Sequence, residues 1–200
     1  MSKDVAGDAA SMEMSDEKLI KAHCRGDTAA FGEIVRRYGG SLLGYLTKMC
    51  GGRAEAEDYF QETFKRVHEK GHTFRGGSFK SWLFTIATRV AINGLRKRRR
   101  LEVVSLNQKI GCKDGNCGEL EAAAAVDEAV RAEQKQQVQD AVESLPAKQR
   151  ATLVLAYYQQ LSYRQVAEVM GCSVGTVKTQ MYRALKVLAR RLPEVAGELK

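Results

Sequence analysis

The chain has 200 residues, with 32 Lys+Arg against 24 Asp+Glu, so its formal net charge is +8, and 44% of its residues are hydrophobic. This length is enough for one or two domains, and the hydrophobic content is too high for a wholly disordered chain. The apolar runs are far shorter than the ~20 residues of a membrane-spanning helix, and the first residues hold no apolar segment typical of a secretory signal. We therefore expect neither membrane insertion nor secretion, and a cytoplasmic location.

The charge is divided into three blocks along the chain. Residues 1–100 carry a net charge of +7, residues 101–144 a net charge of −5 and residues 145–200 a net charge of +6. Two basic bodies separated by an acidic segment indicate a polyanionic partner for the basic parts. Only two prolines, Pro146 and Pro193, are available to interrupt helices. The expected fold is therefore all-α, with two small helical domains joined by a flexible linker.

The first expected domain covers residues 15–100, after a disordered segment 1–14. Apolar residues recur there at three- and four-residue steps, which predicts helices that start at the N-cap Ser15 and are broken near Gly26. Further helices are expected over about 53–68 and 79–99. The last of these ends in five consecutive basic residues, 96–100.

Aromatic residues precede this basic run, at Phe74, Phe79, Trp82 and Phe84. Aromatic rings beside a track of Lys and Arg are typical of proteins that bind single-stranded nucleic acid, because bases stack while the cations follow the phosphates. The alternative is a solvated helix end with ordinary core aromatics. The charge density favours contact with nucleic acid.

Residues 101–130 form the expected acidic linker, with an end that is compatible with a helix. The linker holds Cys112 and Cys117, which could bind metal or form a redox disulfide. A zinc site needs four ligands, and no other cysteine or histidine stands in close pairing with these two. An odd number of cysteines, five in all, instead favours free thiols in a reducing compartment. We expect no metal and no cofactor.

The strongest local pattern lies in the second expected domain, residues 131–192, which is followed by a tail, 193–200. Ser162 and Gln165 form a capping box, Gly171 is suited to end a short helix, and Ser173 can cap the next one. Two short helices joined by such a turn predict a helix-turn-helix over 163–182, although an ordinary αα-hairpin has the same outline. The side chains expected to contact duplex DNA are Ser173, Thr176, Lys178, Thr179, Gln180 and Arg183.

Three motifs in this order resemble the bacterial extracytoplasmic-function (ECF) sigma factors. They are residues 56–64 (AEDYFQETF), residues 74–100 and residues 145–185. The resemblance implies a polymerase-binding helix, a segment that melts the promoter and reads its minus-10 element, and a domain that reads the minus-35 element. It departs from the family at Arg89, where many relatives have Asn, and at Gln180, where Arg is frequent.

The resemblance also implies a role for particular residues. Core polymerase binding falls to Asp58, Tyr59, Gln61, Glu62 and Lys65. Minus-10 binding falls to Phe74, Arg75, Ser78, Lys80, Trp82, Arg89, Asn93, Arg96, Lys97, Arg98, Arg99 and Arg100. The implied partners are bacterial core RNA polymerase, promoter DNA and an anti-sigma factor, and the acidic linker is expected to thread through the polymerase.

Two other classes of protein remain as alternatives to a sigma factor. A dimeric regulator could bind duplex DNA through the helix-turn-helix, but the chain lacks a heptad seam and has a separate aromatic and basic domain. An enzyme is disfavoured because the chain has no Gly-rich phosphate loop, no HExxH and no GxSxG motif. We therefore expect no catalytic residues.

Overall fold

The computed structural model describes residues 14–106 and 125–192, and the side chains of 102–106 and 125–132 lie outside that description. Over these ranges the chain is helical and forms no strand, which confirms the all-α fold. The elements in chain order are α2 Asp16–His23, α3 Thr28–Cys50, α4 Arg53–Lys70, the 3-10 turn η1 Gly71–Thr73, α5 Phe79–Leu106, α6 Ala125–Glu143, α7 Ala147–Tyr157, α8 Tyr163–Met170 and α9 Val174–Arg191. None of these helices, in the residues searched, is long and apolar enough to cross a membrane.

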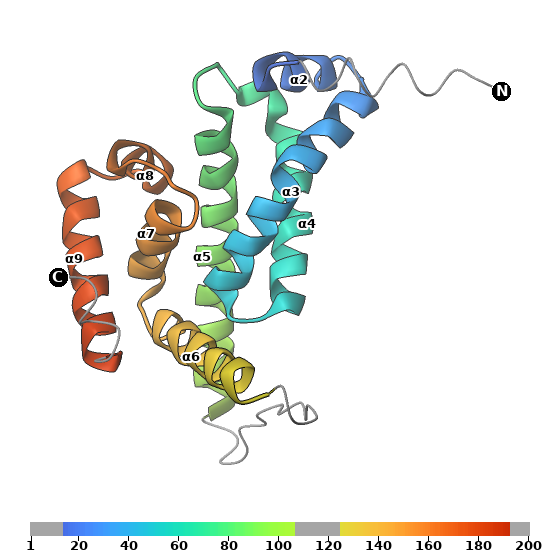
Figure 1. Cartoon of the computed structure of the whole chain (residues 1–200). Coiled ribbons are helices and arrows are strands. Elements are labelled where there is room, and N and C mark those ends of the chain that lie inside the picture. Colours follow the sequence, from blue (N-terminus) through green and yellow to red (C-terminus); the bar gives the residue numbers. More distant parts are fainter. Residues whose placement is uncertain (1–13, 107–124, 193–200) are drawn as a thin grey trace.

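Helices α2 to α5 form the amino-terminal domain, in which α3, α4 and α5 lie side by side and α2 crosses one end (Figure 1). The buried side chains recur at helical spacing, so each helix turns one apolar face to a shared core. That core includes Ile34, Leu42, Leu46, Val67, Leu83, Phe84 and Ala87. A buried hydrogen bond of 2.8 Å joins the hydroxyls of Tyr45 and Thr88, and so ties α3 to α5. The core therefore holds α5, which carries the basic run, in a defined position.

The long helix α5 continues past the basic run to Leu106, further than the sequence analysis expects. After Arg100 the chain has no glycine or proline before Gly111, so nothing in the sequence ends the helix earlier. At the other end of the linker, α6 begins at Ala125 in an alanine-rich stretch that favours helix. Residues 101–106 and 125–130 of the expected linker are therefore helical. Residues 107–124, with Cys112 and Cys117, lie outside the described residues.

Helices α6 to α9 form the carboxy-terminal domain. Its core joins α7, α8 and α9 through a set of fully or almost fully buried apolar side chains: Val154, Leu155, Val166, Val169, Val177, Met181 and Ala184. The residues of α9 in this set are three or four positions apart, as predicted for a helix with one inward face. The opposite face of α9 is left for solvent or a partner.

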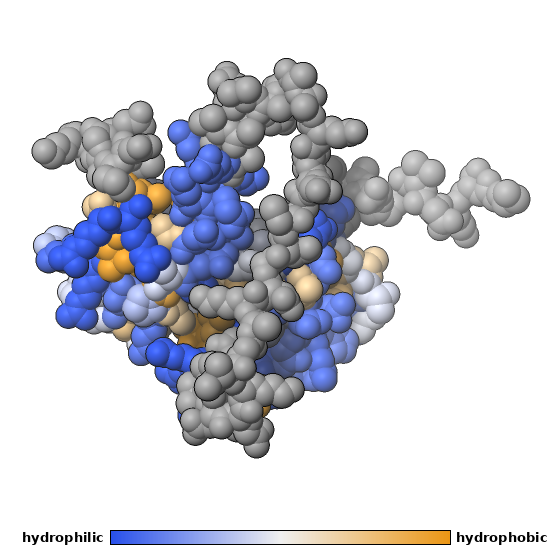
Figure 2. Space-filling view, turned by 90° about the horizontal axis from the view of Figure 1, so that it is seen from below, coloured by the Kyte–Doolittle hydropathy of each residue, from blue (hydrophilic) through white to orange (hydrophobic). Residues whose placement is uncertain are grey.

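The two domains pack against one another in this structure. Helix α8 contacts α5, while α6 and α7 contact α3 (Figure 1). The face seen from below is mainly hydrophilic, with hydrophobic residues gathered in a few small areas (Figure 2). The sequence analysis does not predict this packing, because it treats the two domains as independent bodies separated by the linker.

Candidate nucleic-acid interface

The helix-turn-helix predicted from the sequence is formed by α8, a tight turn and α9. The Gln165 backbone N–H donates to Ser162 Oγ at 3.3 Å, and the Ser162 N–H donates to Gln165 Oε1 at 2.9 Å, which completes a capping box. Gly171 ends α8 with a φ of 61°, in the left-handed region. Ser173 then caps α9 by accepting from the Thr176 N–H at 3.1 Å. These local signals are confirmed, and they set the angle at which α9 leaves the turn.

The outer face of α9 carries the residues expected to contact duplex DNA. Most of them are exposed, namely Ser173, Thr176, Lys178, Thr179 and Arg183. Gln180 is half-buried. The Thr179 hydroxyl donates to the Gly175 carbonyl at 3.0 Å, so its orientation is fixed by its own helix. Among these predicted residues Lys178 and Arg183 carry a charge, and side chains of their type can contact guanine acceptors or phosphates in a major groove.

One exposed aromatic on this face escapes the sequence analysis. Tyr182 is 67% exposed, the most exposed large hydrophobic side chain among the described residues. It follows the buried Met181 and precedes the exposed Arg183. Its helical neighbours, Lys178 and Thr179, lie four and three residues earlier on the same side of the helix. Its position in the sequence could have identified it, because Tyr182 does not fit the helical spacing of the buried residues Val177, Met181 and Ala184.

The basic run at the far end of α5 is fully on the surface. Arg96, Lys97, Arg99 and Arg100 are exposed, and Arg98 pairs with Glu55 of α4. Arg89 and Asn93 are also exposed on α5, about two turns and one turn before the run, respectively. The structure therefore places these predicted contacts on one helix, where they form an exposed basic surface.

Aromatic rings cluster at the beginning of α5. Phe74, Phe79 and Trp82 contact each other with ring centroids 5.6 Å apart, and Tyr38 of α3 joins them 5.4 Å from Phe79. Phe79 is buried, whereas Phe74 and Trp82 are half-buried. Phe84 is completely buried, so it is a core residue, which is the alternative that the sequence analysis left open for these aromatics. Of the aromatics that precede the basic run, only Phe74 and Trp82 therefore have exposed edges that a nucleobase could contact.

The polar residues around this aromatic cluster differ in how accessible they are. Arg75 and Ser78 are exposed, and the Ser78 hydroxyl accepts from the Ser81 N–H at 3.1 Å, which caps the start of α5. Lys80, in contrast, is half-buried and its ammonium donates to the Gln159 carbonyl of the other domain at 2.8 Å. In this structure Lys80 is therefore turned toward the carboxy-terminal domain.

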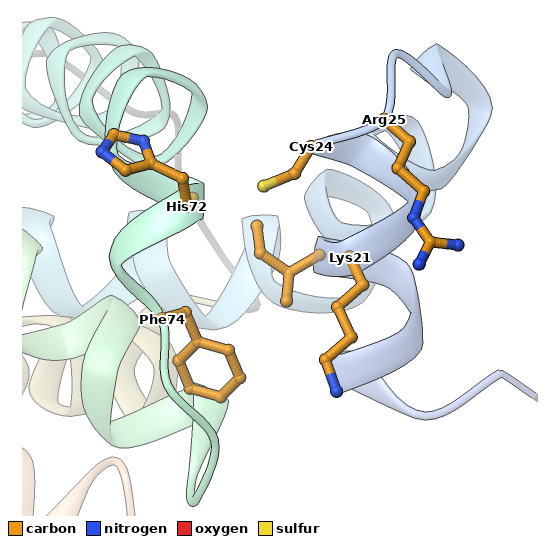
Figure 3. A pocket seen from close by; sticks show the side chains of 7 residues that line it. Lys21, Cys24, Arg25, His72 and Phe74 are labelled. Atoms are coloured by element: carbon orange, nitrogen blue, oxygen red, sulfur yellow. The ribbon is translucent and has the colours of Figure 1, made fainter.

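A cavity of about 250 Å³ lies beside Phe74, between α2 and the segment 71–74. Its lining residues are Ile20, Lys21, Cys24, Arg25, Gly71, His72 and Phe74. Figure 3 shows Cys24 and Phe74 pointing into the cavity from opposite walls. A cavity lined by the Phe74 ring and by two cations, Lys21 and Arg25, has the chemistry to hold a flat base attached to a phosphate.

A charged network holds α2, which forms one wall of this cavity. The buried Glu33 accepts from Arg36 at 2.7 Å and from Arg37 at 2.6 Å. Arg37 also pairs with Asp16 at 3.2 Å, and the Tyr38 hydroxyl donates to the same carboxylate at 2.5 Å. The hydrogen bonds from Arg36 and Arg37 lower the pKa of the Glu33 carboxyl to about 2. Glu33 is therefore ionised at neutral pH and helps to fix α2 on α3.

The predicted polymerase-binding residues lie on α4. Asp58, Gln61 and Lys65 are exposed and share one side of the helix by their spacing. Glu62 is half-buried and pairs with Arg66 at 2.7 Å. Tyr59 differs from these four, because its ring packs on Gly94 of α5 inside the domain.

Three cysteines fall within the described residues. Cys24 is exposed, Cys172 is half-buried in the turn between α8 and α9, and Cys50 is buried. Burial raises the pKa of the Cys50 thiol to about 12, so this thiol stays protonated at neutral pH. Among the described residues no group of three or more His, Cys, Asp or Glu side chains is placed to hold a metal ion.

Comparison with protein families agrees with this two-part arrangement. A model of sigma-70 region 2 matches residues 34–101, which span most of α3, all of α4 and the basic run of α5. A second model, of sigma-70 region 4, matches residues 135–188, which include the whole helix-turn-helix. The two matches are in the order in which the motifs occur along the chain.

Individual relatives match almost the whole chain. It is 31% identical over 189 residues to the ECF RNA polymerase sigma factor SigW of Bacillus subtilis (strain 168), which covers 92% of this chain and 100% of that protein. It is 34% identical over 194 residues to the ECF RNA polymerase sigma factor BldN of Streptomyces coelicolor, with 96% and 70% covered.

Two solved structures resemble the fold over both domains. One is the sigma factor RpoE in complex with the anti-sigma factor NepR from Bartonella quintana, with a TM-score of 0.62, 25% identity and coverage of 82% of this chain and 96% of that one. The other is CnrH in complex with the cytosolic domain of CnrY, with a TM-score of 0.66, 23% identity and coverage of 90% and 97%.

Proposed function

Because the chain belongs to the ECF sigma factors of the sigma-70 family, we propose that it binds bacterial core RNA polymerase and directs promoter-specific initiation by holding minus-35 duplex DNA and unpaired minus-10 DNA. It acts as a dissociable specificity subunit in the cytoplasm and leaves the chemistry of RNA synthesis to the polymerase. The domain of residues 15–100 binds the polymerase and the minus-10 DNA, and the domain of residues 131–192 binds the minus-35 duplex.

The observation that supports this proposal most directly is that the two domains present two chemically different exposed surfaces. The outer face of α9 presents Lys178 and Arg183 on a helix of 18 residues, about 27 Å long, which is the kind of element that enters a major groove. The α5 surface instead combines aromatic edges with a basic track, which suits unpaired strands. A protein that opens a duplex needs both kinds of surface.

Promoter opening is assigned to the cavity, the aromatic cluster and α5. An unpaired base is stabilised by stacking and edge contacts that offset the few kcal/mol lost when it leaves the duplex. In the cavity beside Phe74, the Phe74 ring offers a surface for the base, and Lys21 and Arg25 offer cations for its phosphate. Asn93, Arg89 and residues 96–100 then follow the strand along α5.

Polymerase binding is assigned to the exposed side of α4 with Asp58, Gln61, Glu62 and Lys65. This side of the helix faces away from the core of the domain, and it remains exposed while the two domains are packed together. Tyr59 supports this surface from inside by fixing α4 against α5. An anti-sigma factor is a further expected partner, since the RpoE and CnrH structures contain NepR and the cytosolic domain of CnrY.

The experiment that tests the proposal is reconstitution with core polymerase. We expect the purified chain to co-purify with bacterial core RNA polymerase and to yield discrete run-off transcripts from a genomic fragment library. Transcripts present only when the chain is added establish the function and reveal the promoter elements. Tight binding to duplex DNA alone, together with no association with the polymerase, would support a conventional helix-turn-helix regulator and reject the proposal.

A further inference from the structure

Helix α9 is rich in cations and contains no acidic residue. Its cations are all exposed, namely Lys178, Arg183, Lys186, Arg190 and Arg191. Among the residues that the structure describes, none of these side chains takes part in an ion pair. The DNA contacts predicted from the sequence use only the first two of these cations, so the charge on the second half of the helix has no assigned role.

Two of the remaining cations, Lys186 and Arg190, lie on the side of α9 that is expected to face duplex DNA. With about 100° per residue, Thr179 and Arg183 are at about 100° and 140° from Lys178 around the helix axis. On the same scale Lys186 is at about 80° and Arg190 at about 120°. Both cations therefore lie within the sector that the predicted DNA contacts occupy.

The two cations are displaced from the predicted base contacts along the helix axis. At a rise of about 1.5 Å per residue, Lys186 lies about 12 Å and Arg190 about 18 Å beyond Lys178. The major groove of B-DNA is about 12 Å wide, and helix-turn-helix proteins read base edges with the N-terminal residues of the second helix. When Lys178 is at the base edges, cations this far along the same face reach the sugar–phosphate backbone that borders the groove.

From this we infer that Lys186 and Arg190 bind phosphates that flank the minus-35 bases, so that the outer face of α9 is one DNA-binding surface from Lys178 to Arg190; the inference rests on the proposed function. Phosphate contacts fix the position and orientation of a protein on the duplex and do not read its sequence. Their affinity comes from the release of counterions and falls with added salt. The second half of α9 thus adds affinity, and the choice of sequence belongs to its first half.

An alternative role for Arg190 is to stabilise the end of the helix. Arg190 and Arg191 both lie in the last turn of α9, where cations interact favourably with the helix dipole. Arg191 is about 100° further around the axis than Arg190 and therefore lies outside the DNA-facing sector. Loss of Arg191 removes the same charge from the same helix end without changing that sector, so Arg191 provides the control.

The test compares the wild-type chain with Lys186→Ala, Arg190→Ala and the double variant. The control is Lys148→Ala/Arg191→Ala, which removes an equal charge from exposed positions on α7 and on the other side of α9. The full chain is titrated with two labelled duplexes, one that contains the minus-35 element found by run-off transcription and one in which those bases are scrambled. Each titration is repeated between about 50 and 200 mM salt.

The first readout is the slope of the logarithm of the binding constant against the logarithm of the salt concentration. Loss of one phosphate contact makes this slope shallower by about 1. We expect a change of about 1 in each single variant, about 2 in the double variant and little in the control. A wild-type slope in the double variant, or the same change in the control, would overturn the inference. Failure of the wild-type chain to bind either duplex at the lowest salt would overturn it as well.

The second readout is the ratio of the affinities for the two duplexes. Because phosphate contacts carry no sequence information, the double variant should lose about 10- to 100-fold in affinity for both duplexes and keep the wild-type ratio. A loss confined to the minus-35 duplex would identify the two side chains as base contacts and overturn their assignment to phosphates.

The scrambled duplex separates this inference from the proposed function. If the chain does not bind core polymerase but the double variant has a shallower slope on the scrambled duplex, the proposed function fails and the phosphate contacts stand. If the chain directs promoter-specific transcription but the slope is unchanged in the double variant, the phosphate contacts fail and the proposed function stands.

Discussion

The ring of Tyr59 on α4 lies directly over Gly94 of α5, where any Cβ on residue 94 would overlap the phenol. Glycine in a helix interior costs about 1 kcal/mol relative to alanine. Its place inside α5 is explained by this close approach, which brings α4 and α5 together. Burial raises the pKa of Tyr59, in agreement with a ring packed within the domain.

The Tyr59–Gly94 contact predicts strong coupling between two substitutions. In a Tyr59→Ala background, Gly94→Ala should raise the free energy of unfolding by about 1 kcal/mol, because only the gain in helix propensity remains. In the wild-type background the added methyl group must displace the ring, so the gain should vanish or reverse. Urea unfolding of the four proteins measures the coupling. Additive effects of the two changes would contradict it.

The charged network around Glu33 predicts a pH-dependent contribution to stability. The folded-state pKa, about 2, lies below the ordinary value of 4.5, so the stabilisation is present above about pH 4.5 and is lost as the pH falls toward 2. Glu33→Gln should therefore lower the Tm at pH 7, and the difference from wild type should shrink between pH 4.5 and 2. Glu57→Gln, at an exposed ion pair with Arg53, is the control that should change little. A difference that is constant with pH would contradict the assignment.

The sequence predicted the parts of the interface that depend on local signals. The cap at Ser162, the left-handed Gly171 and the cap at Ser173 all involve residues within three or four positions of each other, so the pattern contains the whole interaction. The inward face of α9 was predictable for the same reason, since helical spacing alone determines it. The basic run was visible directly in the sequence, as five consecutive Lys and Arg residues at 96–100.

The contacts between domains could not be predicted in this way. Lys80 and Gln159 are far apart in the chain, and neither belongs to a pattern that marks it as part of an interface. Arg150 lies in the first turn of α7, four residues after Pro146, and nothing in the sequence marks it as buried. Only the fold shows that its guanidinium is buried between α3 and α6. The cavity likewise depends on how α2 meets the segment 71–74.

Separate surfaces for DNA and polymerase predict separate losses. Arg183→Ala should weaken minus-35-dependent initiation by about 10- to 100-fold, as for the loss of a base or phosphate contact, and should leave polymerase binding intact. Asp58→Ala should weaken polymerase binding and leave duplex binding by the carboxy-terminal domain unchanged. Arg191→Ala and Glu69→Ala, which remove equal charges from exposed positions on the same two helices, are the controls. Equal losses in both assays for either variant would refute this division.

The exposed ring of Tyr182 predicts an additional contact of α9 with duplex DNA. Tyr182→Ala should reduce affinity for the minus-35 element, whereas Tyr182→Phe should retain most of it if the ring makes an apolar contact with bases. Because Tyr182 is 67% exposed, neither change should lower the Tm appreciably. Titration of a labelled minus-35 duplex distinguishes the variants, and full affinity in Tyr182→Ala would remove this residue from the interface.

The cavity beside Phe74 predicts a way to block promoter opening alone. Cys24, the C-cap residue of α2, points into it, so Cys24→Phe should fill the space that we assign to an unpaired base. Base stacking is worth about 1–3 kcal/mol, so opening should slow by roughly 10- to 100-fold, while polymerase binding and minus-35 binding stay unchanged. Cys24→Ser keeps the size of the side chain and should behave as wild type. Permanganate reactivity of unpaired thymines in the polymerase complex measures opening, and wild-type reactivity in Cys24→Phe would show that no base enters this cavity.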